Sequence, residues 1–261
     1  MLDFTFSLAS FEYYLLILVR VASFIAVAPF FGLQGTPTRV KAGLSAVIAL
    51  LLYHALDAQT YMYEGVIGYG TLVIKEALVG VIIGFFANLA TYCVGFAGSL
   101  IDMQVGMSMA QEYNPMTRTT ESISGNLLNY LILLFLITSD LYHFILRAAA
   151  ESFEVLPIGE AVLNWDSLVA TMLKYAVDLF VIGFRISLPV FASMLVVNCI
   201  LGIMAKVAPQ MNMFAVGIQM KFLFGYLVMF LMMSMLPHAA VMISDELKLL
   251  MRLAVSGMQV G

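Results

Sequence analysis

Ionisable side chains are rare in this sequence, and those that interrupt apolar stretches have the types and spacing that could do chemistry. Lys174, Asp178 and Arg185 share one apolar stretch at spacings of four and seven residues, which places them along one face of a helix. A stripe of acid and base in a membrane helix can carry protons or can join helices together. Two cations beside one acid favour its ionised form, which suits proton carriage poorly. We therefore expect this stripe to join helices or subunits.

Asp140 and His143 form a second candidate pair, with the i, i+3 spacing that brings two side chains onto one helix face. One imidazole and one carboxylate could bind a metal ion or pass a proton, but they complete neither a zinc site nor a catalytic triad. The sequence also has no metalloprotease motif, nucleophile elbow or phosphate-binding glycine loop. We expect a pair at a helix boundary, no metal, no cofactor and no enzymatic activity.

Arg20 is the lone charge in the apolar run of residues 13–38. Such a residue faces a protein partner or a wet cavity, or else extends to the headgroups from a helix end. We expect a contact with another helix or another subunit. Lys75 and Glu76 directly precede a further apolar run and are expected to mark a helix boundary.

Residues 198–225 contain a polar interruption between two apolar segments. Pro209 cannot donate a helical hydrogen bond and disfavours the helical conformation of the residue before it, so the arriving helix should end near Ala208. The turn that follows carries amides and is flanked by lysines: Gln210, Asn212, Lys206 and Lys221. These groups indicate a working surface, although a loop at a membrane boundary with lysines reaching the headgroups would have a similar composition.

Residues 101–122 are the most polar interior stretch and are rich in methionine. Because methionine is unbranched and adaptable, such a segment can close a hole or pack against a changing surface. The alternative is an ordinary interhelical loop whose methionines fill gaps.

The composition places these features in a membrane protein. The 261 residues are 62% hydrophobic and only 11% charged, far from the values of soluble domains. The net charge of -4, without a basic stripe, argues against binding of nucleic acid.

The apolar runs predict an all-α fold with six long hydrophobic helices. The runs are residues 13–38, 42–56, 77–101, 122–139, 186–205 and 222–244. Gly80 and Gly84 have the spacing that allows close approach of two helix backbones. Pro189 and Pro237 are expected to kink or break their helices.

Several strings resemble the FliR family of type III secretion export-gate proteins. The most specific is AKVAPQMNMFAVGIQMK, which combines a proline, an amide pair, a glycine and two lysines at fixed spacing. The segments RVKAGLS, DMQVGMSMAQEYNP, FEVLPIG and RISLPV are also similar to that family, so the resemblance covers nearly the whole chain.

The resemblance implies an all-α fold of kinked, hydrophobic helical hairpins that form part of a multi-subunit helical pore complex, largely above the bilayer plane. It implies assembly with FliP-like, FliQ-like and FlhB-like subunits, contact with membrane lipid, and passage of unfolded export substrates. The location it implies is the bacterial inner membrane at the flagellar basal body. The expected organisation is one export-gate domain, 1–261, with N-terminal helices (1–100), a plug-like loop (101–122), middle helices (123–205), a polar turn (206–221) and a last helix with the C-terminal end (222–261).

The resemblance also assigns residues to roles. The pore-plug residues that it implies are Gly106, Met107, Ser108, Met109, Ala110, Gln111, Glu112, Tyr113, Asn114 and Pro115. The residues expected at subunit interfaces or as interior charges are Arg20, Lys174, Asp178, Arg185, Lys206, Pro209, Gln210, Asn212 and Lys221.

A secondary transporter of a small solute is the alternative function. Transporters of this class often have inverted repeats with interrupted helices in matching halves. The prolines near residues 29 and 37, and again near 189 and 209, permit such a repeat, but their flanking sequences do not match.

Overall fold

The helices follow the apolar runs closely in a computed structural model that describes residues 8–29, 31, 36–56, 63, 65–107, 112–114, 119–210 and 212–259. Within those residues the α-helices are α1 (Leu8–Val27), α2 (Thr38–Ala55), α3 (Gly65–Val105), α4 (Ile123–Thr138), α5 (Leu141–Val155), α6 (Trp165–Val207), α7 (Met213–Met232) and α8 (Leu236–Ser256). Two strands of three residues, β1 (Glu112–Asn114) and β2 (Thr119–Glu121), pair as an antiparallel ribbon. The predicted all-α class is confirmed, with this ribbon as its one small addition among the described residues.

Contacts divide the chain into two compact units built from interleaved segments. Unit 1 contains the residues up to Ala90, Asp140–Tyr175 and the residues from Glu246 onward. Unit 2 contains Thr91–Ser139 and Ala176–Asp245. Because α3, α6 and α8 each contribute to both units, the assignment of one export-gate domain stays a prediction.

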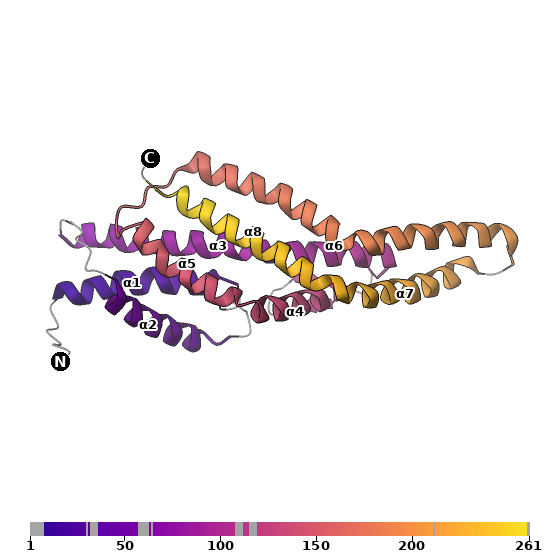
Figure 1. Cartoon of the computed structure of the whole chain (residues 1–261), viewed down its shortest axis with the longest axis horizontal. Helices are drawn as coiled ribbons and strands as arrows, with labels where there is room; N and C mark the ends of the chain where they lie inside the picture. Colours follow the sequence, from indigo (N-terminus) through magenta and orange to yellow (C-terminus); the bar gives the residue numbers. More distant parts are fainter. Residues whose placement is uncertain are drawn as a thin grey trace. The chain divides into compact units, whose positions relative to one another are not determined.

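In unit 1, α1 and α2 form an antiparallel pair (Figure 1), and α3 packs against α1 through glycines. A Cβ atom added at Gly80 would lie 2.2 Å from the carbonyl oxygen of Arg20, and one at Gly84 would lie 2.8 Å from that of Phe24. The two backbones therefore touch at these positions, and only glycine fits there. The close approach predicted for this pair of glycines is confirmed.

In unit 2, the end of α3 makes a similar contact with the start of α4. A Cβ atom added at Gly98 would lie 2.1 Å from the Cα atom of Gly125. The C-terminal part of α6 and α7 form a helical hairpin (Figure 1). Earlier in α6, Phe180 contacts α3, because the ring of Phe96 lies edge-on to it at 5.2 Å between centroids.

The two prolines expected to kink or break their helices, Pro189 and Pro237, both lie inside helices. Pro189 lies inside α6, which continues unbroken to Val207. The final apolar stretch is interrupted by the 3-10 turn Met233–Met235 (η2), and Pro237 falls in the first turn of α8. A proline there is well tolerated, because the first N–H groups of a helix have no intrahelical partner.

Four helical segments are long and apolar enough to cross a membrane, or five if α4 and α5 together form one span. These segments are Ser10–Val27, Gly65–Val105, Trp165–Val207 and Phe214–Ser256. The predicted count of six is therefore too high by this criterion. Polar residues at both ends of α2 lower its mean hydropathy, and the α4–α5 pair is interrupted by Ser139 and Asp140.

The glycine contact in unit 2 predicts a stability change that is specific to one position. Replacing Gly98 with alanine should destabilise the protein by about 1–3 kcal/mol, because the new methyl group meets the backbone of α4 and the helices must separate. Thermal unfolding of the full chain in lipid nanodiscs, followed by circular dichroism, measures this change.

Gly95→Ala is the matched control, since a Cβ atom at that position of the same helix meets nothing within 4 Å. It should leave the melting temperature unchanged or raise it slightly, because alanine favours helix more than glycine does. Equal effects of the two substitutions would contradict the close approach of α3 and α4.

Candidate functional site

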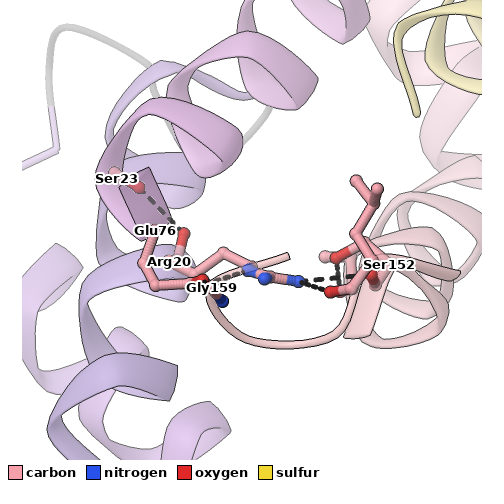
Figure 2. Close-up of polar contacts among 7 residues, drawn as sticks. Arg20, Ser23, Glu76, Ser152 and Gly159 are labelled. Carbon is pink, nitrogen blue, oxygen red and sulfur yellow. Dashed lines mark hydrogen bonds and ion pairs between the residues drawn. The ribbon is translucent and has the colours of Figure 1, made fainter. Parts of the chain in front are cut away.

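Arg20 and Glu76 form a buried ion pair between α1 and α3 in unit 1. The Nε atom of Arg20 lies 2.5 Å from Oε2 of Glu76, and the two side chains are 2% and 0% exposed. Figure 2 shows Arg20 extending from its helix between Glu76 and the backbone at Ser152. A charge buried this deeply is tolerated only with a partner of opposite charge and further hydrogen bonds.

Further hydrogen bonds to both members of the pair come from the end of α5 and the turn after it. Nη1 of Arg20 donates to the carbonyl oxygens of Ser152 at 3.2 Å and Leu156 at 2.9 Å. The amide of Gly159 donates to Oε1 of Glu76 at 2.9 Å (Figure 2). The pair therefore joins three segments of unit 1 that are far apart in the sequence.

The guanidinium group of Arg20 also lies over the ring of Phe153, 4.2 Å from its centroid. A cation over an aromatic face is attracted by the ring, most strongly when both are shielded from water. Phe153 is itself fully buried. The ring of Phe153 therefore adds a second stabilising contact to the buried guanidinium group, besides the ion pair with Glu76.

The prediction that Glu76 marks a helix boundary is wrong, because the residue lies well inside α3 and is fully buried. The apolar residues 65–74 already belong to the helix, so Lys75 and Glu76 interrupt an apolar run and do not begin one. Lys75 remains exposed and donates to the carbonyl oxygen of Gly159 at 3.1 Å. Reading the run from residue 65 would have made Glu76 an interior acid and the natural partner for Arg20.

The predicted plug segment begins where α3 ends. Gly106 has φ +92°, a left-handed conformation that ends a helix readily when the residue is glycine. The amides of Gly106 and Met107 both donate to the carbonyl oxygen of Asp102, at 3.0 and 2.8 Å. Residues 112–114 of the predicted plug form β1, so this part of the expected loop is a strand. Ser108, Met109, Ala110, Gln111 and Pro115 lie outside the described residues.

Asp102 is a buried carboxylate that the sequence analysis did not single out. Its side chain is 1% exposed and accepts from the amide of Ser124, with its oxygens at 3.3 and 3.4 Å. Ser122 caps the same helix end by accepting from the amide of Gly125 at 2.7 Å. The N-terminus of a helix favours a negative charge, so Asp102 lies where the start of α4 stabilises it. Asp102 follows Gly98 by four residues, which places both on one helix face, and this spacing could have indicated that Asp102 faces the neighbouring helix.

The end of α6 in unit 2 agrees with the prediction, whereas most of the predicted polar turn, residues 206–221, is helical, because α7 already begins at Met213. The amide of Ala208 donates to the carbonyl oxygen of Met204 at 2.8 Å, and α6 ends at Val207 as expected. Asn212 begins α7 as its N-cap and accepts from the amide of Ala215 at 3.3 Å. Of the other residues predicted to matter in this turn, Lys206, Pro209 and Gln210 are exposed and Lys221 is half-buried.

Lys174, Asp178 and Arg185 all lie on α6, and the first and last of them are exposed while Asp178 is partly buried. Nη1 of Arg185 lies 4.0 Å from the sulfur of Met242. Their role as an interhelical or intersubunit stripe stays a prediction.

Asp140 and His143 form the boundary pair that the sequence predicts. Asp140 precedes α5 in a left-handed conformation, and its Oδ1 lies 3.4 Å from Nδ1 of His143. Both side chains are mostly exposed, at 77% and 65%. Across the part of the chain that the structure describes, no group of three or more histidine, cysteine or acidic side chains is arranged to hold a metal ion.

The Arg20–Glu76 pair generates a stability prediction. Glu76→Gln should cost about 3–5 kcal/mol, because it leaves the guanidinium group buried without a counter-charge. Thermal unfolding of Glu76→Gln, Arg20→Met and the double variant would form a double-mutant cycle, in which the double variant loses less than the sum of the two.

Asp140→Asn serves as the control, because it removes one partner of an exposed pair in the same unit and should cost less than about 1 kcal/mol. Additive losses for Arg20→Met and Glu76→Gln would contradict a direct interaction between the two side chains.

Comparisons with known proteins identify the family of this chain. The model of the family described as "Bacterial export proteins, family 1" matches residues 11–247. The chain is 30% identical to the flagellar biosynthetic protein FliR of Bacillus subtilis (strain 168) over 228 residues, which cover 87% of this chain and 88% of that protein. The FliR of Pectobacterium carotovorum is 30% identical over 222 residues, covering 85% and 84%, and that of Escherichia coli (strain K12) is 27% identical over 234 residues, covering 89% of each. The chain therefore belongs to the FliR family of bacterial export proteins.

Proposed function

We propose that this chain is a core structural subunit of the flagellar type III protein export gate, where it lines and plugs the pore through which unfolded flagellar proteins pass. The observation that carries the proposal is the apolar surface that α6 and α7 leave uncovered. Val207 and Phe214, on either side of the polar turn, are 79% and 78% exposed. Further large apolar side chains continue this surface along both helices: Leu195, Val196, Ile203, Leu223, Leu227 and Phe230.

Polar groups within this surface favour protein partners over lipid alone. The exposed Lys206, Gln210 and Asn212 lie beside Val207 and Phe214, and in hydrocarbon such groups are costly unless protein or water satisfies them. Neighbouring subunits can supply both an apolar face and polar partners. We propose that these are FliP-like, FliQ-like and FlhB-like chains, in a complex at the flagellar basal body in the bacterial inner membrane.

We propose that residues 106–115 form the plug of this pore. Two structural facts support the proposal. These residues belong to the connection between α3 and α4, which leaves α3 through the left-handed Gly106 and enters α4 from the antiparallel ribbon of β1 and β2. Its two ends are therefore fixed close to helix termini, while its methionines supply adaptable apolar contacts. The role assigned to the chain is mechanical, with no catalytic step.

Removing the plug should open the pore. We expect that replacing residues 106–115 with a glycine-serine linker of equal length leaves assembly intact and makes the membrane leaky to small solutes, because a flexible polar linker cannot seal an apolar constriction. Ion conductance across cells or proteoliposomes that contain the complete complex measures the leak.

A linker that replaces residues 57–62, between α2 and α3, is the control and should not change conductance. Unchanged conductance in an assembled complex with the 106–115 replacement would exclude the plug role.

The polar turn should be needed for assembly or export. Lys206→Glu and Lys221→Glu reverse charge beside the exposed apolar surface, and we expect each to reduce recovery of the complex or secretion of flagellar proteins by at least about tenfold, the effect of a mispaired interface charge. Co-purification and secretion are the two measurements.

Lys206→Arg and Lys221→Arg keep the charge and should retain most of the activity. Normal secretion in both glutamate variants would contradict a role of the polar turn in assembly or export.

The mass of the purified complex distinguishes a gate subunit from a small-solute transporter. The full chain, tagged at its C-terminus and expressed with its neighbouring genes, should yield a discrete complex with several different subunits in native mass spectrometry. A folded monomer or homodimer that binds a solute alone would overturn the proposed function.

A further inference from the structure

We propose that α7 couples the exposed turn between α6 and α7 to both ends of the segment that joins α3 to α4. The coupling is a property of unit 2 alone; its consequence for a pore rests on the proposed function, in which residues 106–115 block that pore. All the contacts that carry the coupling lie within unit 2.

The first contact joins α7 to the start of the connecting segment. The hydroxyl group of Tyr226 donates to the sulfur of Met107 at 2.7 Å. One residue earlier, Gly225 packs against the last turn of α3, where an added Cβ atom would lie 2.6 Å from Cγ2 of Val105. The middle of α7 therefore touches the point at which the chain leaves α3.

The second contact joins α7 to the end of the same segment. The hydroxyl group of Ser124, in the first turn of α4, donates to the sulfur of Met229 at 3.6 Å. Both side chains are buried. Because Tyr226 and Met229 are three residues apart, one face of α7 contacts the start and the end of the connecting segment.

Asp102 joins these two ends directly. Its carbonyl oxygen accepts from Gly106 and Met107, and its carboxylate accepts from the amide of Ser124. The end of α3 and the start of α4 are therefore hydrogen-bonded to the same residue, Asp102, and we call this arrangement the junction. A displacement of α7 acts on the junction as a whole.

The same helix begins at the exposed turn. Asn212 caps α7, and Tyr226 lies 14 residues later, about 20 Å along the helix axis. A hydrogen-bonded helix transmits a displacement along its axis with little deformation, so a partner bound at the exposed turn can move the junction. Coupling between two sites requires such an element whose position both sites influence.

Hydrogen exchange of the full chain in lipid nanodiscs tests the coupling. Asn212→Ala removes the cap of α7, and we expect amide exchange in peptides covering residues 119–126 to increase by about threefold to tenfold, the effect of losing one helix cap on a linked opening. In a background with Tyr226→Phe and Ser124→Ala, the same substitution should increase that exchange much less, because both hydrogen bonds between α7 and the junction are absent and only the apolar contact of Gly225 with Val105 remains.

Matched controls are available in the same chain. Asn164 accepts from the amide of Ser167 at 3.2 Å at the start of α6, so Asn164→Ala removes an equivalent cap in unit 1 and should leave residues 119–126 unchanged. Tyr130→Phe removes the hydroxyl group of an exposed tyrosine on α4 and should also have no effect. Asn212→Asp retains a capping oxygen and should behave like the unmodified chain.

Two results would overturn the proposal. The first is that Asn212→Ala leaves amide exchange at residues 119–126 unchanged. The second is that Asn212→Ala increases this exchange equally in the unmodified chain and in the Tyr226→Phe/Ser124→Ala background. If Asn212→Ala does not fold, Asn212→Gly, which also removes the capping side chain, replaces it with the same expected direction.

Ion conductance measured in parallel separates this proposal from the plug. Increased exchange without a leak would retain the coupling and show that movement of the junction does not by itself open the pore. A leak without increased exchange would contradict the coupling.

Discussion

The requirement that every buried charge be neutralised within an apolar chain sets the arrangement of unit 1. Arg20 and Glu76 can be buried only together, and their contacts with Ser152, Leu156 and Gly159 bring the end of α5 and the turn after it to α1 and α3. The pair adds little net stability compared with a well-packed apolar core, but the loss of either member would leave the other stranded. Its contribution is therefore to fix which segments meet.

Helix α3 contains the same arrangement twice, namely an acidic residue and a glycine that are one helical turn apart. Glu76 and Gly80 face α1, where the acid binds Arg20 and the glycine lets the backbones touch. Gly98 and Asp102 face α4, where the glycine meets Gly125 and the acid accepts from the first turn of that helix. Close approach shortens the distance that each carboxylate must reach, so the small residue and the buried charge depend on each other. In the first case the partner is a cation, and in the second it is the N-terminus of a helix.

Much of the secondary structure could be predicted from the sequence, because turn chemistry is local. Pro209 ends α6 within a residue of the predicted position, Ala208. The start of α7 was missed, because Asn212 caps a helix that begins at Met213, nine residues before the predicted last helix at residue 222. The burial of Glu76 was not predicted, because a charged residue next to an apolar run looks the same whether it begins a helix or interrupts one. The strand at residues 112–114 was missed for another reason. Its pairing with residues 119–121 depends on two anchored helix ends, which no local pattern reports.

The length of the longest helices has a further consequence. Helices α3 and α6 contain 41 and 43 residues, so each follows a path of about 60 Å, roughly twice the thickness of a hydrocarbon core. Tilt can absorb only a modest part of such an excess. The apolar length that the chain's own helices leave uncovered needs other protein to cover it, so the folded lifetime of each copy should depend on the supply of its neighbours. A copy synthesised in excess would display the kind of hydrophobic surface that chaperones and proteases recognise, so the number of surviving chains would be set by the number of assembled complexes.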